Sequence, residues 1–268
     1  MLELLQLLQL ADSALPIGAS AHSFGLETLS AEGELTPTTL ARFFADLLQE
    51  TAPLEAAGCR SAYELADAQL FNATTFYAQW VRLNQTLSAR KPARESREAS
   101  ATLGKRFLRL AASLEPLPRL QHAVRIADTL NVGTHTGGTD NVGTDKNVGT
   151  DNVGTDKNVG TDNVGTHKVD LHLCTAFGLV GGCLGLGTEA VTLAYLQQNL
   201  TGLLSACQRL MPVGQNQVMA LSWQLKPLLV QIATRSQSTD LDSIPSFAPL
   251  LELAGMRHAS LPVRLFIS

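Results

Sequence analysis

The sequence predicts an all-α fold: a single-domain bundle of about ten helices, spanning residues 1–268, with a low-complexity loop insertion. Three observations support this fold class. Apolar residues recur with the spacing of an amphipathic helix along most of the chain. No segment shows sustained two-residue alternation bounded by hairpin turns, which is the pattern of strands. The segment 131–168 instead repeats the motif NVGTD, so it stands apart from the helical pattern.

The first helices are predicted by their apolar stripes and by the residues that begin them. The leucine-rich segment 1–16 contains Glu3 and has no basic stretch at its start, so it is typical of a helix and not of a signal peptide. The next long helix is expected to begin at Thr36 and Pro37, because threonine is a good N-cap and proline fits the first helical position. Its stripe comprises Leu40, Phe43, Phe44, Leu47 and Leu48.

The later helices are predicted in the same way. Asn72 is the expected N-cap of the helix after it, a further helix begins at about Pro92, and another follows Pro118. The apolar, glycine-rich segment 171–187 is short for a membrane span and predicts a buried, closely packed helix. Pro227 is expected to bend its helix or loosen one turn. The expected inward-facing residues are Phe76, Trp80, Leu83, Leu87, Leu103, Phe107, Leu110, Leu120, Val124, Ala127, Leu130, Val218, Leu221, Leu225, Leu228, Leu229 and Ile232.

The insertion 131–168 has little to bury and many glycines, whose ordering is entropically costly. We therefore expect a disordered loop between two helices. Aspartate recurs in it, as in the glycine–aspartate repeats that bind calcium, but the nine-residue spacing of those repeats is absent. No calcium site is predicted.

Composition and motifs exclude several classes of function. The net charge is −4 and no long basic stripe is present, which argues against nucleic acid as a ligand. The sequence lacks the Walker A, H-E-x-x-H, G-x-S-x-G and EF-hand motifs. The G-x-G-x-x-A match at 185–190 lies in a helical context, so we interpret the pairs Gly178/Gly182 and Gly181/Gly185 as close-packing positions and not as a dinucleotide site.

Metal sites and cofactors are not predicted either. The four cysteines form no CxxC pair, and the six histidines show no ligand spacing with one another or with cysteine. Isolated cysteines in apolar runs fit a reducing compartment, so a cytoplasmic protein with no membrane association is expected.

A few polar groups remain as candidates for binding. His22 and His258 each lie in a polar island within an otherwise apolar terminal segment. The segment 90–100 concentrates charge in a chain whose charged residues amount to only 16%. It is either a solvated helix face, with Arg94 and Glu98 paired one turn apart, or a polar docking surface. In the turn 211–217, glutamines either cap the next helix or present amides to a partner.

Four segments together resemble the urease accessory proteins of the UreF type. They are LLQLADSALPIGASAHSFGLE near the start, LNQTLSARKPARESREASATLGKRFL in the centre, MPVGQNQ, and MRHASLPVRLFIS at the end. They follow the family's order and are spread over nearly the whole chain. There are departures: Val213 replaces the usual leucine, Ser96 replaces the leucine of E-L-R, Ile267 stands where arginine is common, and the NVGTD repeat has no family counterpart.

The resemblance implies a role that composition does not show. Members of this family are maturation factors of nickel urease and are not known as enzymes. They bind a second accessory protein of the UreD or UreH type and recruit or regulate a GTPase of the UreG type, which supplies nickel. The complex then docks on apo-urease. The sequence leaves open whether the chain forms a homodimer.

We therefore expect a scaffold that acts through its surfaces, without a catalytic centre. The expected partner contacts are His22, Phe24, Glu27, Arg94, Arg97, Gln215, Arg257, His258 and Arg264, among which Arg97 is the best candidate for a merely bracing role. The alternative is an all-α ligand-binding bundle or enzyme in which His22, Glu27 and the Arg90–Arg97 cluster converge on a deep pocket. A third hypothesis is direct nickel carriage by His22, His258 or the cysteines.

Overall fold

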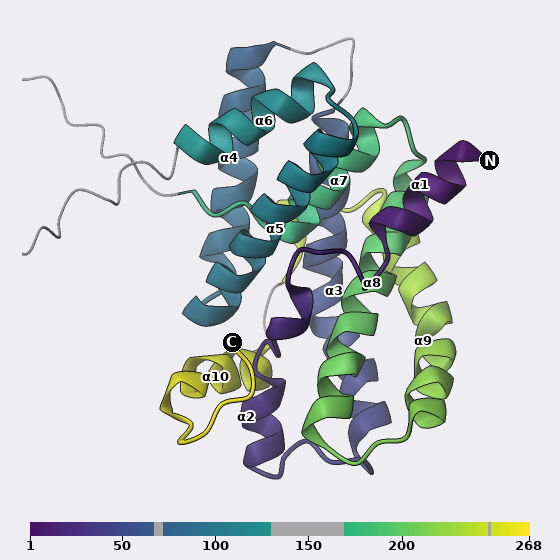
Figure 1. Ribbon diagram of the computed structural model, residues 1–268, viewed down its shortest axis with the longest axis vertical. Helices are drawn as coiled ribbons and strands as arrows, with labels where there is room; N and C mark the ends of the chain where they lie inside the picture. The colour runs from purple at the N-terminus through teal and green to yellow at the C-terminus, as the bar shows by residue number, and fades with distance from the viewer. Residues whose placement is uncertain (67–71, 130–168, 246–247) are drawn as a thin grey trace, which may run out of the picture.

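The computed structural model describes residues 1–66, 72–129, 169–245 and 248–268 (Figure 1). These residues form ten α-helices with a few short 3-10 turns and contain no strand, which confirms the predicted all-α bundle. The insertion 131–168, together with its expected disorder, lies outside the described residues.

The α-helices are α1 (Leu2–Leu10), α2 (Leu26–Ala31), α3 (Leu40–Glu64), α4 (Ala73–Ala89), α5 (Arg94–Leu114), α6 (Pro118–Thr129), α7 (Leu173–Cys183), α8 (Thr188–Leu210), α9 (Gln215–Ser236) and α10 (Pro249–Arg257). Three 3-10 turns are η1 (Ala19–Ala21), η3 (Leu241–Ser243) and η4 (His258–Ser260).

Helix α3 forms the centre of the bundle, because α4, α7, α8 and α9 all pack against it. In Figure 1 the helices α4, α5 and α6 lie on one side of α3, and α8 and α9 lie on the other. Helices α2 and α10 pack together at the end of the molecule where the chain terminates. The predicted inward-facing residues that are described are buried or half-buried, as the helical spacing requires.

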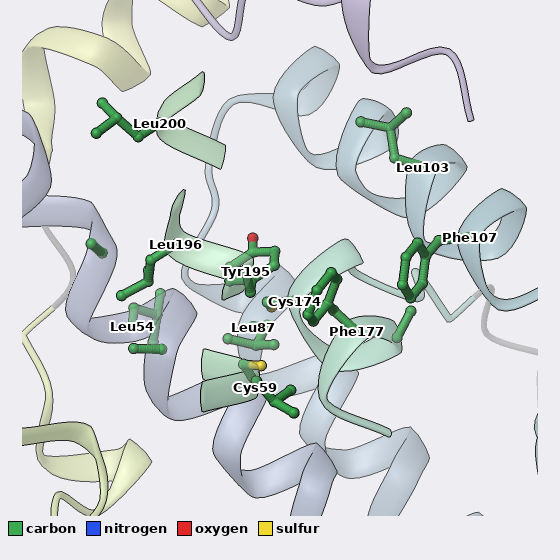
Figure 2. Packing of buried hydrophobic residues seen from close by; sticks show 14 of the residues in the cluster. Leu54, Cys59, Leu87, Leu103, Phe107, Cys174, Phe177, Tyr195, Leu196 and Leu200 are labelled. Carbon is green, nitrogen blue, oxygen red and sulfur yellow. The ribbon is translucent and has the colours of Figure 1, made fainter. Parts of the chain in front are cut away.

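The aromatic centre of the core joins three helices (Figure 2). The rings of Phe107 on α5 and Phe177 on α7 stack with their centroids 5.1 Å apart. Phe177 also contacts the ring of Tyr195 on α8, at 5.7 Å. Cys59 and Cys174 lie beside these rings as buried thiols, and neither forms a disulfide. The cysteines in this region therefore act as small apolar residues.

Helix α7 is almost entirely buried, as predicted for the segment 171–187. Its Gly178 and Gly182 lie directly against the backbone of α3: an added Cβ would collide with the carbonyl groups of Cys59 and Tyr63 respectively. The close packing predicted for this glycine pair is therefore confirmed. No helix among the described residues is both long and apolar enough to cross a membrane.

The second predicted glycine pair does not act as a pair. Gly181 faces Val191 of α8. Gly185 follows the end of α7 with a left-handed φ of +70°, and an added Cβ there would contact nothing within 4 Å. Its conformation, and not a close contact, therefore favours glycine. The described residues contain no strand before 185–190, so this match lacks the βαβ context that a dinucleotide site needs.

The predicted helix starts differ in accuracy. The side chain of Asn72 accepts hydrogen bonds from the N–H groups of Thr74 and Thr75, at 2.9 and 3.2 Å, so its role as an N-cap is confirmed. Helix α3, by contrast, begins at Leu40 and not at Pro37.

A hydrogen-bonded turn at residues 36–39 precedes α3. The N–H of Thr36 donates to the hydroxyl of Thr39 at 3.0 Å, and the N–H of Thr39 donates to the hydroxyl of Thr36 at 3.3 Å. This reciprocal pair is the arrangement of a capping box, with a second threonine in place of the usual glutamate or glutamine. It closes residues 36–39 into a turn ahead of the regular helix.

Two helices continue through an internal proline. Helix α9 contains Pro227, as expected, and α3 contains Pro53, which the sequence analysis did not single out. Each proline removes one backbone hydrogen bond from its helix. Both helices nevertheless run unbroken. Helix α3 packs against α4, α7, α8 and α9, and α9 packs against α3 and α8, so this packing outweighs the loss. The bend expected at Pro227 stays a prediction.

Candidate functional site

The C-terminal segment is fixed to the rest of the chain by a buried polar cluster. His258 follows α10 directly and its side chain is fully buried. One ring nitrogen, Nε2, lies 2.8 Å from a carboxyl oxygen of Glu27 on α2, and the other, Nδ1, lies 2.7 Å from a carboxyl oxygen of Glu95 on α5. This imidazole therefore ties the end of α10 to two other helices. We call Glu27, Glu95 and His258 the C-terminal clamp.

Glu27 also holds the segment that follows the clamp. Its carboxylate accepts the backbone N–H groups of Leu265 at 2.5 Å and Phe266 at 3.1 Å. Burial alone would raise the pKa of Glu27, but these two N–H groups and His258 outweigh it, and the pKa is lowered from its ordinary value. Glu27 is thus a carboxylate at neutral pH, and its bonds lie within the chain.

The last residue of the chain docks on the segment before α2. The hydroxyl of Ser268 lies 2.8 Å from Nδ1 of His22, and its carbonyl oxygen accepts from the hydroxyl of Ser23 at 3.0 Å and the N–H of Phe24 at 3.2 Å. Phe24 has a left-handed φ of +52°, an unusual conformation for a residue with a side chain. The pKa of His22 is lowered by burial and by the charge of Arg106. His22 is therefore engaged within the chain.

Two arginines of the C-terminal segment remain accessible. Arg257 pairs with Glu32 at 2.7 Å and Arg264 lies 3.7 Å from Glu95, with 51% and 44% of their side chains exposed. Both guanidinium groups therefore retain donors at the surface, in contrast to the buried His258.

The two segments that carry these arginines also expose apolar side chains. It consists of side chains that are 46–83% exposed, namely Leu250, Leu253 and Met256 of α10 and Val263, Leu265 and Ile267 of the final segment. We call these six residues the C-terminal face. In the final segment the exposed Leu265 and Ile267 flank Phe266, which is buried. Because Glu27 of the clamp holds the N–H groups of Leu265 and Phe266, it fixes which side of the segment faces solvent.

In the charged segment 90–100, Arg97 is bound within the chain, whereas Arg94 is exposed. Arg94 is 79% exposed and pairs with Glu98 at 2.9 Å, the expected pair one turn apart. Arg97 donates to the carbonyl of Lys91 at 2.7 Å and lies 3.6 Å from Asp170, with 27% of its side chain exposed. Arg97 thus braces the start of α5 within the chain, whereas Arg94 is free to meet solvent or another molecule.

A cavity of about 180 Å³ lies between α10 and the body of the bundle. Its walls come from α3, α5, α7, α8 and α10. Arg90 and Lys91 line it, but His22 and Glu27 do not. The ligand-binding or enzymatic alternative required His22, Glu27 and the Arg90–Arg97 cluster to converge on one deep pocket. His22 and Glu27 do not take part in this cavity. Among the described residues, no group of three or more His, Cys, Asp or Glu side chains is placed to hold a metal ion.

The polar end of the cavity contains residues that the sequence analysis missed. Glu55 of α3 pairs with Lys91 and accepts a hydrogen bond from the hydroxyl of Tyr195 on α8. Burial would raise the pKa of Glu55, but the charge of Lys91 and the two hydrogen bonds outweigh it and hold the pKa at about 2. The sequence feature that could have pointed to Glu55 is its place as a carboxylate within the apolar run 52–59. Most residues of this run are buried.

Comparison with known proteins identifies the family. Residues 35–226 match the family model for UreF. The chain belongs to the UreF family. It is 26% identical to the urease accessory protein UreF of Geobacillus kaustophilus, over 99% of this chain and 98% of that protein. It is 28% identical to the proteins of the same name from Nostoc sp., over 98% and 95%, and Thermosynechococcus vestitus, over 99% and 97%.

Three of the four segments that resemble the UreF family meet in the C-terminal clamp. Glu27 belongs to the first segment, Glu95 to the central one and His258 to the last. The fourth segment, 211–217, contributes nothing to the clamp. Its Gln215 begins α9 with an exposed side chain and makes no cap for that helix, which has Gly214 as N-cap.

Proposed function

We propose that this UreF-family chain is a urease maturation factor that acts as a cytoplasmic scaffold and not as an enzyme. In this proposal it binds an accessory protein of the UreD or UreH type. The pair then recruits or regulates a UreG-type GTPase, which supplies nickel to apo-urease. Family membership and relatives named urease accessory proteins support the role in urease maturation. The four free cysteines are consistent with a reducing compartment.

The C-terminal face is the proposed docking surface for the accessory protein. This assignment rests on one observation: six large apolar side chains are exposed on a short segment that a buried clamp holds in place. Exposed apolar groups that form a patch are typical of interaction sites. A preformed patch also loses less conformational freedom on binding than a mobile one.

The residues predicted to contact a partner fall into two groups in this proposal. Arg94, Arg257, Arg264, Gln215 and the half-buried Phe24 are accessible and supply direct contacts.

The second group consists of His22, Glu27 and His258, which are at least 92% buried, and Arg97. These residues support binding indirectly, because they fix the segments that carry the contacts. Arginine at the rim of an apolar patch is a common source of interface specificity.

Co-expression with a UreD-type protein from the same organism, followed by pull-down, tests the proposal. The tagged wild-type chain is expected to retain the partner, and Leu253→Glu is expected to lose it, because a charge replaces a side chain that is 53% exposed on the C-terminal face. Val230→Glu is the matched control, since Val230 is 48% exposed on α9 and lies outside that face. Arg264→Ala is expected to weaken retention while the circular dichroism spectrum stays unchanged.

Each outcome has a definite meaning. If the wild-type chain does not retain the partner, the scaffold proposal as a whole is refuted. Equal retention by Leu253→Glu and Val230→Glu would instead remove the C-terminal face as the docking surface. Unchanged retention by Arg264→Ala would remove this arginine as a contact.

A further inference from the structure

The cavity under α10 is large enough for a small organic molecule. Its volume of about 180 Å³ exceeds the roughly 150 Å³ of an engineered protein cavity that binds benzene. Most of its wall is apolar, with leucines from α3, α5, α7, α8 and α10, including Leu103, Leu196 and Leu251. Figure 2 shows Leu103 on α5 and Leu196 beside Tyr195 on α8.

Lys91 and Asn199, two polar residues of the cavity, retain hydrogen-bonding groups that no other residue of the described chain engages. Both oxygens of Glu55 are engaged, one by Lys91 and the other by Tyr195. The ammonium of Lys91 has three N–H donors, and within the described part of the chain its hydrogen bonds go to Glu55 alone. Asn199 donates one N–H to the Tyr195 hydroxyl at 3.4 Å, which leaves its amide oxygen and its second N–H.

These groups define the kind of ligand that fits. The spare donors of Lys91 require a hydrogen-bond acceptor, which an alkylammonium ion does not have. A carboxylate is disfavoured because three acidic side chains, Glu50, Glu55 and Glu252, line the cavity against two basic ones. An alcohol or an amide satisfies both conditions, since it is uncharged and presents an oxygen acceptor.

We propose that this cavity binds a small uncharged amphiphile. Its oxygen acceptor lies at Lys91 and Asn199, and its apolar part, of about six carbons, lies among the leucines. The inference is independent of the proposed role in urease maturation. Helix α10 forms one wall through Leu251 and Glu252, so a bound ligand also restrains α10 against the body of the bundle.

Four probes of equal chain length test the ligand class on the complete chain: 1-hexanol, hexanamide, hexanoate and hexylammonium. Binding is measured by saturation-transfer NMR and calorimetry. Hexanol and hexanamide are expected to bind saturably. Hexylammonium, which has no acceptor for Lys91, and hexanoate, whose charge meets the acidic lining, are each expected to bind at least about tenfold more weakly. Hydrogen exchange in α10 is expected to slow when hexanamide is present. No saturable binding of any probe, or tighter binding of either ion, would overturn the proposal.

Three variants locate the binding. Leu203→Trp fills the cavity from α8 and is expected to abolish hexanamide binding. Asn199→Leu removes the amide but keeps the Glu55–Lys91 pair, and is expected to weaken hexanamide binding about tenfold. The matched control is Asn216→Leu at the exposed start of α9, which is expected to bind as the wild type does.

Hexanamide binding that is unchanged in Asn199→Leu would place the ligand elsewhere and overturn the assignment. This variant decides the matter even if Leu203→Trp fails to fold, because residue 199 is only half-buried. None of these measurements uses a partner protein, so their failure is distinguishable from failure of the pull-down.

Discussion

Replacement of Glu55 by glutamine tests the electrostatics of the core most directly. The substitution keeps the size of the side chain and one acceptor oxygen, but it removes the charge that faces Lys91. Only 14% of the Glu55 side chain and 16% of the Lys91 side chain are exposed, so solvent screens the pair weakly. Loss of one partner leaves the other charge buried without compensation, which is the costly way to break such a pair.

The magnitude follows from the pKa of Glu55. A pKa held at about 2 in the folded chain, against an ordinary value of 4.5, corresponds to about 3 kcal/mol of stability at neutral pH. Because the folded-state pKa is the lower of the two, this contribution is present above pH 4.5 and is lost as the pH falls toward 2. Protonated Glu55 resembles glutamine in charge and shape, so the wild type and Glu55→Gln are expected to become equally stable at low pH.

Urea unfolding followed by circular dichroism at several pH values measures this difference. We expect Glu55→Gln to be less stable than the wild type by about 3 kcal/mol at pH 7, with the difference shrinking steadily below about pH 4.5. Glu50→Gln, at an exposed position of the same helix, serves as the control and is expected to have little effect. A difference that stays constant from pH 7 to pH 3 would show that packing, and not charge, causes the loss, and would refute the reasoning.

Two further predictions concern the close packing around α7. Gly178→Ala is expected to lower the free energy of unfolding by about 1–3 kcal/mol or more, because its Cβ collides with the backbone of Cys59. Gly202→Ala, on an open face of α8, is expected to raise it by up to about 1 kcal/mol, and chemical denaturation of both variants compares them. The thiols are expected to resist a disulfide reagent in the native protein, because burial raises their pKa values, to about 11 for Cys183. Reaction at Cys59 before Cys183 would contradict this, since Cys183 is the least buried of the four.

The fold was predictable because the signals are local. Helical periodicity, the cap at Asn72 and the paired glycines of α7 depend on residues within a few positions of one another. The start of α3 was predicted three residues too early: Thr36 and Thr39 form the bonds of a capping box, but residues 37–39 form a turn and the regular helix begins at Leu40. The passage of α3 through Pro53 was not predictable, since packing on several sides decides it.

The candidate site was predictable only in part, because its contacts join distant residues. Periodicity does not indicate that His258 contacts Glu27, which lies 231 positions earlier. The family resemblance drew attention to the right segments, but it did not distinguish buried residues from exposed ones. Glu55 and Tyr195 were missed because each looks like an ordinary member of an amphipathic helix until the two helices are placed together.

The way α10 is held explains why buried polar residues matter for a surface function. A nine-residue helix is too short to be stable alone, and its buried residues, Ala254 and Gly255, contribute little apolar area. Its position therefore depends on polar contacts: the clamp at its end, and near its start the bond from the Ala93 N–H to Glu252 at 2.7 Å.

A substitution in the clamp must therefore displace the C-terminal face without touching any partner. For this reason, lost partner retention in a Glu27→Gln variant does not identify Glu27 as a contact residue. Faster hydrogen exchange over residues 249–268 in the isolated variant would show that the segment has detached. Unchanged exchange with lost retention would instead require that Glu27 act on the partner directly, which its burial opposes.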